Sequence, residues 1–150
     1  ADNGVRNSTF AGGYGIYVAG GSVKMTNCIV WNHGDDLYNV PGGNIYYSCI
    51  EDGDNNGVNN CTNANPSFAD RTYYHLKSLS GHYINGYFSG GSWTNSTNHS
   101  VLIDFGDPAR PFTYEPNPHG NRVNIGAYAN SPTASKSGPE PLRGTMYLFY

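Results

Sequence analysis

The stretch EDGDNNGVNN, residues 51–60, places oxygen-bearing side chains at alternate positions and follows them with a glycine. This is how a calcium loop begins, because alternating oxygens converge on one ion and the glycine makes the sharp turn. The last position of such a loop falls on Asn63, where a bidentate acid is normally needed. A weak Ca²⁺ site and a plain polar turn, whose side chains satisfy their own backbone, both remain open. The Ca²⁺ ligands would be Asp52, Asp54, Asn56, the Val58 carbonyl and, through water, Asn60.

A second acidic motif is NHGDD, residues 32–36. Two carboxylates could act as acid and base in glycoside hydrolysis. Asp35 and Asp36 are adjacent, however, so on a strand they would point to opposite faces. The motif is also flanked by turn-forming residues and has no basic residue close by to hold an acidic sugar. We therefore interpret it as a solvated turn and assign no catalytic residue.

Aromatic side chains are the main candidates for binding a ligand. Flat rings can cover the C–H faces of sugars, as they cover other apolar surfaces. The alternative is that the same rings close the open end of a repeat structure. The candidates for carbohydrate binding are Trp31, Trp93, Tyr83 and Tyr87, with Phe88 beside them.

Composition restricts the class of protein. Charged residues make up 13% of the 150 residues, the net charge is −3, and there are 20 glycines. Abundant glycine and aromatic residues predict short strands and many turns. The low content of Lys and Arg argues against nucleic-acid binding, and no apolar run is long enough for a transmembrane segment. Three cysteines, Cys28, Cys49 and Cys61, are too few for a disulfide scaffold and have no zinc-site spacing.

The first half of the chain contains a repeat. VRNSTF begins at Val5, MTNCIV at Met25 and YYSCIE at Tyr46, so the offsets are about 20 and 21 residues. This alignment places Cys28 and Cys49 in one column, on neighbouring rungs. A period near 20 with several short strands per repeat predicts a right-handed parallel β-helix. An immunoglobulin-like sandwich would explain the strands but not the matching columns.

Motifs in the second half carry a family resemblance. They are NPSF (65–68), YYHLKS (73–78), LIDFGDP (102–108) and EPNPHGNRVNIGAYAN (115–130). Their order resembles the C-terminal region of bacterial secreted right-handed parallel β-helix repeat proteins, which include anchor-bearing and polymorphic outer-membrane-protein-like chains. The resemblance implies this fold and an extracellular or cell-surface location. It implies no reaction, because one fold serves many functions.

The last motifs contain candidate structural residues. Asp104 and Asp107 precede or occupy Gly/Pro turns, where a carboxylate caps backbone N–H groups. Arg122 could reach a carboxylate of a neighbouring segment through a bidentate pair. We expect these contacts to hold the C-terminal region together.

The sequence therefore predicts an all-β chain. Residues 1–70 form parallel β-helix rungs, 71–130 an irregular C-terminal cap, and 131–150 a linker followed by a short apolar strand. The expected function is a non-catalytic structural or adhesive module, part of a longer β-helix or a self-assembling fibre. Its partners would then be upstream rungs or copies of itself. The alternative is a carbohydrate-binding module, or a fragment of a polysaccharide lyase or hydrolase, with polysaccharide as the partner.

Overall fold

The computed structural model describes residues 4–139, and this part of the chain is all-β. It contains ten short strands and one 3₁₀ turn, η1 (Gly42–Asn44). None of its helical segments is long and apolar enough to cross a membrane. The strands are β1 (Gly4–Arg6), β2 (Thr9–Ala11), β3 (Ile16–Tyr17), β4 (Lys24–Thr26), β5 (Ile29–Trp31), β6 (Leu37–Tyr38), β7 (Ile45–Tyr46), β8 (Cys49–Ile50), β9 (His82–Ile84) and β10 (Ser92–Thr94).

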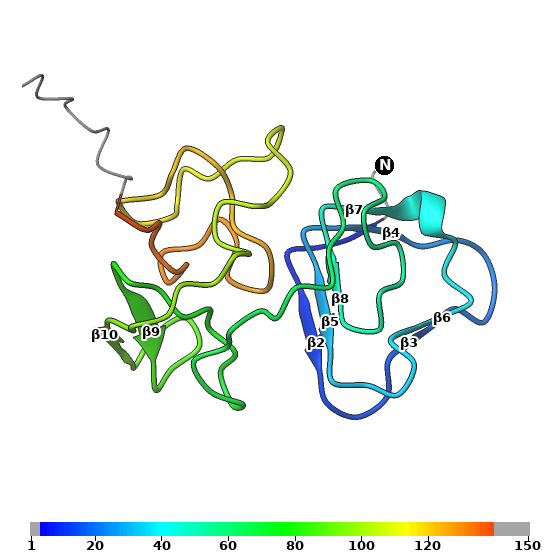
Figure 1. Ribbon diagram of the computed structural model, residues 1–150, viewed down its shortest axis with the longest axis horizontal. Coiled ribbons are helices and arrows are strands. Elements are labelled where there is room, and N and C mark those ends of the chain that lie inside the picture. Colours follow the sequence, from blue (N-terminus) through cyan, green and yellow to red (C-terminus); the bar gives the residue numbers. More distant parts are fainter. Residues whose placement is uncertain (1–3, 140–150) are drawn as a thin grey trace, which may run out of the picture.

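The first eight strands form three parallel sheets, ordered β1-β4-β7, β2-β5-β8 and β3-β6. The chain visits the three sheets in turn and then begins again. We call residues 4–23 coil 1, residues 24–43 coil 2 and residues 44–50 coil 3. In Figure 1 the coils form the right-hand lobe, with β2, β5 and β8 on the side nearest the rest of the molecule.

The register confirms the first predicted offset and corrects the second. Val5 pairs with Met25, as expected from an offset of 20. Met25 then pairs with Ile45 rather than Tyr46, so the second offset is also 20. A sharp corner explains this constancy. Asn7, Asn27 and Tyr47 all have positive φ, at 46°, 57° and 46°, and asparagine adopts this conformation more readily than most residues.

The corrected register separates the two cysteines that were expected to share a column. Ile29 pairs with Cys49, and the Cys28 N–H donates to the Ser48 hydroxyl at 3.2 Å. A slip of one residue moves a side chain to the opposite face of a strand. Cys28 accordingly packs inside the coils, whereas Cys49 packs between the coils and the C-terminal region. All three cysteines are buried and free.

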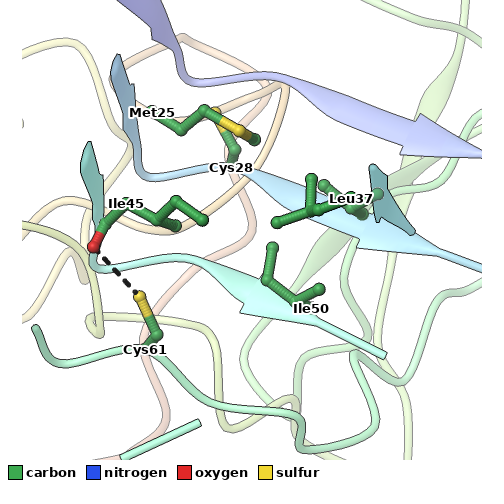
Figure 2. Close-up of a cluster of buried hydrophobic side chains, with 7 residues drawn as sticks. Met25, Cys28, Leu37, Ile45, Ile50 and Cys61 are labelled. Carbon is green, nitrogen blue, oxygen red and sulfur yellow. Dashed lines mark hydrogen bonds between the residues drawn. The ribbon is translucent and has the colours of Figure 1, made fainter. Parts of the chain in front are cut away.

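The interior of the coils is a column of apolar side chains. Figure 2 shows Met25 and Cys28 from coil 2 above Ile45 and Ile50 from coil 3, with Leu37 beside them. Stacked coils place similar side chains about 4.8 Å apart, so the column excludes water along its length.

The motif EDGDNNGVNN belongs to the loop that covers coil 3. This loop, residues 51–64, returns under the coil. The Tyr47 N–H donates to the Asn59 carbonyl at 3.0 Å, and the Asn55 amide donates to the Ile45 carbonyl at 3.1 Å. Cys61 completes the apolar column, where its thiol lies 3.6 Å from the Ile45 carbonyl (Figure 2). The loop thus satisfies backbone groups that the last coil would otherwise leave unpaired.

Residues 65–139 form a compact C-terminal cap with little regular structure (Figure 1). Its only named strands in the described range, β9 and β10, pair antiparallel. The cap lies against the outer face of the β2-β5-β8 sheet, where Leu76, Leu102 and Ile125 pack on Ile29 and Cys49. The expectation that the aromatic residues of this region cover the last rung is therefore wrong, because the 51–64 loop covers that end.

Backbone contacts fix the cap to coils 1 and 2. Asn27 is almost fully buried; its carbonyl accepts the Gly126 N–H at 2.9 Å and its side-chain oxygen accepts the Asp107 N–H at 2.7 Å. The Thr9 hydroxyl accepts the Ala127 N–H at 3.0 Å. Such bonds are directional, so they set the orientation of a contact that apolar packing alone would leave less specific.

The predicted structural residues act inside the cap, with two corrections. The Asp107 carboxylate caps the Ala109 N–H at 2.9 Å, as expected. Asp104 accepts a side-chain donor, the Ser137 hydroxyl at 2.8 Å, where a backbone N–H was expected. Arg122 donates to the carbonyls of Gly106 and Phe105, at 2.7 and 3.2 Å, rather than to a carboxylate.

The described part of the predicted linker is integrated into the cap. Thr133, Ala134, Ser135 and Ser137 are buried, and the Ser135 hydroxyl donates to the Leu76 carbonyl at 2.6 Å. Small hydroxyl side chains bond the backbone of neighbouring segments here, which a Pro/Ser-rich composition does not reveal. The predicted apolar strand at 146–150 lies outside the described residues.

Candidate functional site

A groove of about 520 Å³ lies between the coils and the cap. Its volume is within the range of small-ligand sites. One wall is formed by the ends of β2 and β5, with Ala11, Trp31 and Asn32. The other wall is cap segment 65–77, together with Asn98.

Local folding of the cap segment presents its side chains to the groove. Phe68 and Leu76 form an antiparallel bridge, so the segment folds back on itself. The Asp70 carboxylate stabilises the bend by accepting the N–H groups of Thr72 and Tyr73, at 2.7 and 2.6 Å. The rings of Phe68 and Tyr74 then meet edge to face, with centroids 5.1 Å apart.

The groove combines aromatic, amide and charged side chains. Trp31, on the coil wall, is half-buried and packs partly on the cluster between coils and cap. This mixture is typical of a site that covers an apolar face of a ligand and orients its polar groups. The aromatic members are Trp31, Phe68 and Tyr74, the amides are Asn32, Asn65 and Asn98, and the charged residues are Asp70, Arg71 and Lys77.

The four aromatic residues predicted to bind carbohydrate do not share one surface. Trp31 lies in the groove, whereas Trp93 packs edge-on against Tyr83 in the cap, with ring centroids 5.6 Å apart. Tyr83 is buried, and its hydroxyl oxygen accepts the Gly91 N–H. Tyr87 is exposed and contacts Tyr73. No sequence pattern marked Phe68 and Tyr74 as ligand-binding residues, because only the fold brings them opposite Trp31.

The predicted Ca²⁺ loop contributes to an acidic cluster that includes another coil. Carboxylate oxygens of Asp35, Asp52 and Asp54 lie within 4.8 Å of one another on the surface. Asp35 was not among the predicted ligands, because it belongs to the NHGDD turn of coil 2. The Val58 carbonyl accepts the Cys61 N–H inside the loop. Asn56 and Asn60 are exposed.

Hydrogen bonds join the NHGDD turn of coil 2 to the beginning of the 51–64 loop. The Asp36 N–H donates to the Asp52 carboxylate, and the Asp52 N–H donates to the Asp36 carboxylate, both at 3.0 Å. Asp36 is fully buried and also contacts the His33 ring at 2.8 Å. Partial burial, and then the charges of Asp52, Asp35 and Asp36, raise the pKa of Asp54. Asp36 thus holds the turns together, while three exposed carboxylates repel one another.

Calcium binding remains a prediction, and melting experiments test it. A cation that binds Asp35, Asp52 and Asp54 relieves their repulsion and stabilises the folded chain by mass action. At ten times Kd, the gain is about 1.4 kcal/mol. We expect a higher Tm in 10 mM CaCl₂ than in EDTA. The gain should be lost in Asp54→Asn but kept in Asp70→Asn, a carboxylate outside the cluster. Equal Tm values in CaCl₂ and EDTA would show that the loop is only a turn.

Comparisons with protein-family models, curated proteins and solved structures find no match for this chain.

Proposed function

We propose that residues 4–64 are terminal coils of a right-handed parallel β-helix, and that the chain is a non-catalytic structural or adhesive module of an extracellular protein. The parallel sheets support the architecture, as does the register, which repeats after 20 residues in the β1-β4-β7 and β2-β5-β8 sheets and after 21 in β3-β6. The motif resemblance to bacterial secreted β-helix proteins supports the location. The partner that we propose is a further set of β-helix coils stacked on coil 1.

The 51–64 loop covers the end of the coils at coil 3, and the other end, at coil 1, carries this proposal. In the described residues, β1, β2 and β3 each pair with a strand on one side. Val5, Phe10 and Ile16 are half-buried, whereas their register partners in coil 2 are buried. Within residues 4–139, the sheets thus end at coil 1 and the apolar column there is only half covered, and another coil in parallel register would extend both.

The buried thiols are compatible with an oxidising location. Burial raises the pKa of Cys28 to about 11 and that of Cys49 to about 12. The reactive form of cysteine is the thiolate, so these groups stay protonated and unreactive.

Adding one coil tests the stacking proposal. Residues 1–3 are replaced by a copy of residues 24–43, which places the copied β4 and β5 segments 20 residues before β1 and β2, in the register that these sheets use. We expect the free energy of unfolding to rise by about 2 kcal/mol, because Val5, Phe10 and Ile16 become buried. Exchange of the backbone amide hydrogens of β1 and β2 should also become slower.

The control carries aspartates in the copied coil at the positions of Met25, Val30 and Leu37, so that it cannot form the apolar column. Equal stability of the two extended chains would contradict coil stacking. If the unextended chain dimerises through coil 1 in sedimentation experiments, a second copy is the partner instead.

Carbohydrate binding is a second candidate function, favoured by the groove beside Trp31. Its polar side chains and aromatic faces are suited to sugar rings. This role is independent of coil stacking, because the groove lies on the side of the coils.

A further inference from the structure

We propose that the groove between the β2-β5-β8 sheet and cap segment 65–77 binds an acidic oligosaccharide, with the carboxylates of its uronic acid units recognised by Arg71 and Lys77. The proposal rests on the carbohydrate-binding candidate and names its ligand class.

The aromatic residues supply the stacking surface. Trp31 comes from the coils, whereas Phe68 and Tyr74 come from the folded-back cap segment, and all three line the groove. All three are half-buried, so each ring is supported on one side and leaves part of its surface free. A rigid ring that is already ordered loses little conformational entropy when a sugar packs on it.

The charges of the groove favour an anionic ligand. The Asp70 carboxylate already accepts the N–H groups of Thr72 and Tyr73. Arg71 and Lys77 have no ion-pair partner within residues 4–139. Two cations thus face the groove against one carboxylate that is engaged in its own turn. A carboxylate forms strong, charge-assisted hydrogen bonds with both cations.

The amide side chains provide groups for sugar hydroxyls. Those of Asn32 and Asn98 have no hydrogen-bond partner within the described part of the chain, and both residues are exposed at the groove. An amide can donate and accept at once, which matches a hydroxyl. Aromatic faces, free amides and two cations together fit a carboxylated sugar better than a neutral sugar or a purely apolar ligand.

The net charge of the chain indicates that an acidic sugar would be recognised by particular cations in the groove. The whole chain carries a net charge of −3, so a general attraction for polyanions is not expected. Binding of an acidic sugar should therefore depend on these particular cations. It should also exceed the binding of a simple polyanion of equal charge.

The test uses Trp31 as the reporter. The chain has two tryptophans, so Trp93→Phe leaves Trp31 as the sole indole fluorophore. Hexasaccharides of galacturonate, alginate and hyaluronan are titrated against their methyl-esterified forms, and inorganic polyphosphate is the charge control. We expect a change in Trp31 emission with at least one acidic hexasaccharide and little with its ester.

Variants assign the site. Arg71→Ala and Lys77→Ala should each weaken acidic binding about tenfold, as expected for loss of one charge-assisted hydrogen bond. Lys24→Ala is the matched control, because Lys24 is an exposed cation on the β1-β4-β7 sheet. Circular dichroism verifies that each variant is folded.

Each other outcome overturns a defined part of the proposal. Equal binding of acid and ester keeps the carbohydrate candidate but excludes the acidic class. Equal binding of polyphosphate, or acidic binding that survives both alanine variants, excludes recognition by Arg71 and Lys77. No binding of any sugar excludes the carbohydrate candidate as well, while the added-coil experiment still decides the structural role.

Discussion

Gly126→Ala should lower the free energy of unfolding by about 2–4 kcal/mol, a large part of the stability of a chain of this size. Gly126 has φ of 106°, which is unfavourable for a residue with a side chain. An added Cβ would lie 2.8 Å from the Ile29 Cδ1 atom and 3.0 Å from the Thr9 hydroxyl oxygen. Both atoms belong to the cap-facing sheet, so the substitution combines backbone strain with overpacking between coils and cap.

Gly12→Ala is the matched control for Gly126→Ala. Gly12 also has positive φ, at 76°, but an added Cβ would meet nothing within 4 Å. The control therefore reports backbone strain alone, expected at about 1 kcal/mol. Urea denaturation measures both variants. Equal losses would mean that the coil–cap contact yields to the extra methyl group, and that the docking of the cap is less tightly packed than the structure shows.

Glu115→Gln should raise the free energy of unfolding by about 3 kcal/mol more at pH 8 than at pH 4. Burial raises the pKa of Glu115 from 4.5 to about 7, against the effect of two backbone hydrogen bonds. These come from the N–H groups of Asn124 and Asn130, at 2.9 and 2.8 Å, and both reach Oε1. The other oxygen, Oε2, is buried and has no hydrogen-bond partner within residues 4–139.

The sign follows from the pKa in the two states. The folded protein binds the proton of Glu115 more tightly than the unfolded chain does. The stability from protonated Glu115 is therefore fully present below about pH 4.5 and is lost as pH rises through about 7. Glutamine keeps an oxygen for the two N–H groups and carries no charge, so it removes this pH dependence.

Denaturation of wild type and Glu115→Gln at pH 4 and pH 8 isolates the effect, because the other titrating groups cancel in the difference. Glu115→Ala serves as the second variant. It removes the acceptor of two backbone N–H groups and should be destabilised at both pH values. A difference between wild type and glutamine that does not change with pH would show that Glu115 ionises freely in the folded protein.

Some features of the coils followed from sequence because they are local or periodic. Short β-prone runs with turns between them predicted an all-β chain, and the spacing of Val5 and Met25 matched the register of β1 with β4 and of β2 with β5. The second offset failed because matching residue types, Cys28 with Cys49 and Ile29 with Ile50, suggested 21 residues. The actual register depends on the corner at Tyr47, where a bulky residue with positive φ takes the place of an asparagine.

The position of the cap was decided by tertiary structure. Ile29 and Cys49 lie on the outer face of a sheet whose inner face is also apolar, so this sheet needs cover on both sides. Sequence shows the apolar residues of such a strand but not which segment covers the second face. The partner residues Leu102 and Ile125 lie far along the chain, in segments without periodicity.

For the candidate sites as well, some residues could be identified from sequence and others only from the fold. Sequence identified Asp52, Asp54 and Trp31 from their residue types, since chemistry depends on the side chain. Only the fold added Asp35 to the acidic cluster and placed Trp31 opposite Tyr74 in the groove. Their distances are set by the stacking of coils and by the docking of the cap, and such contacts between residues distant in sequence leave no local pattern in the chain.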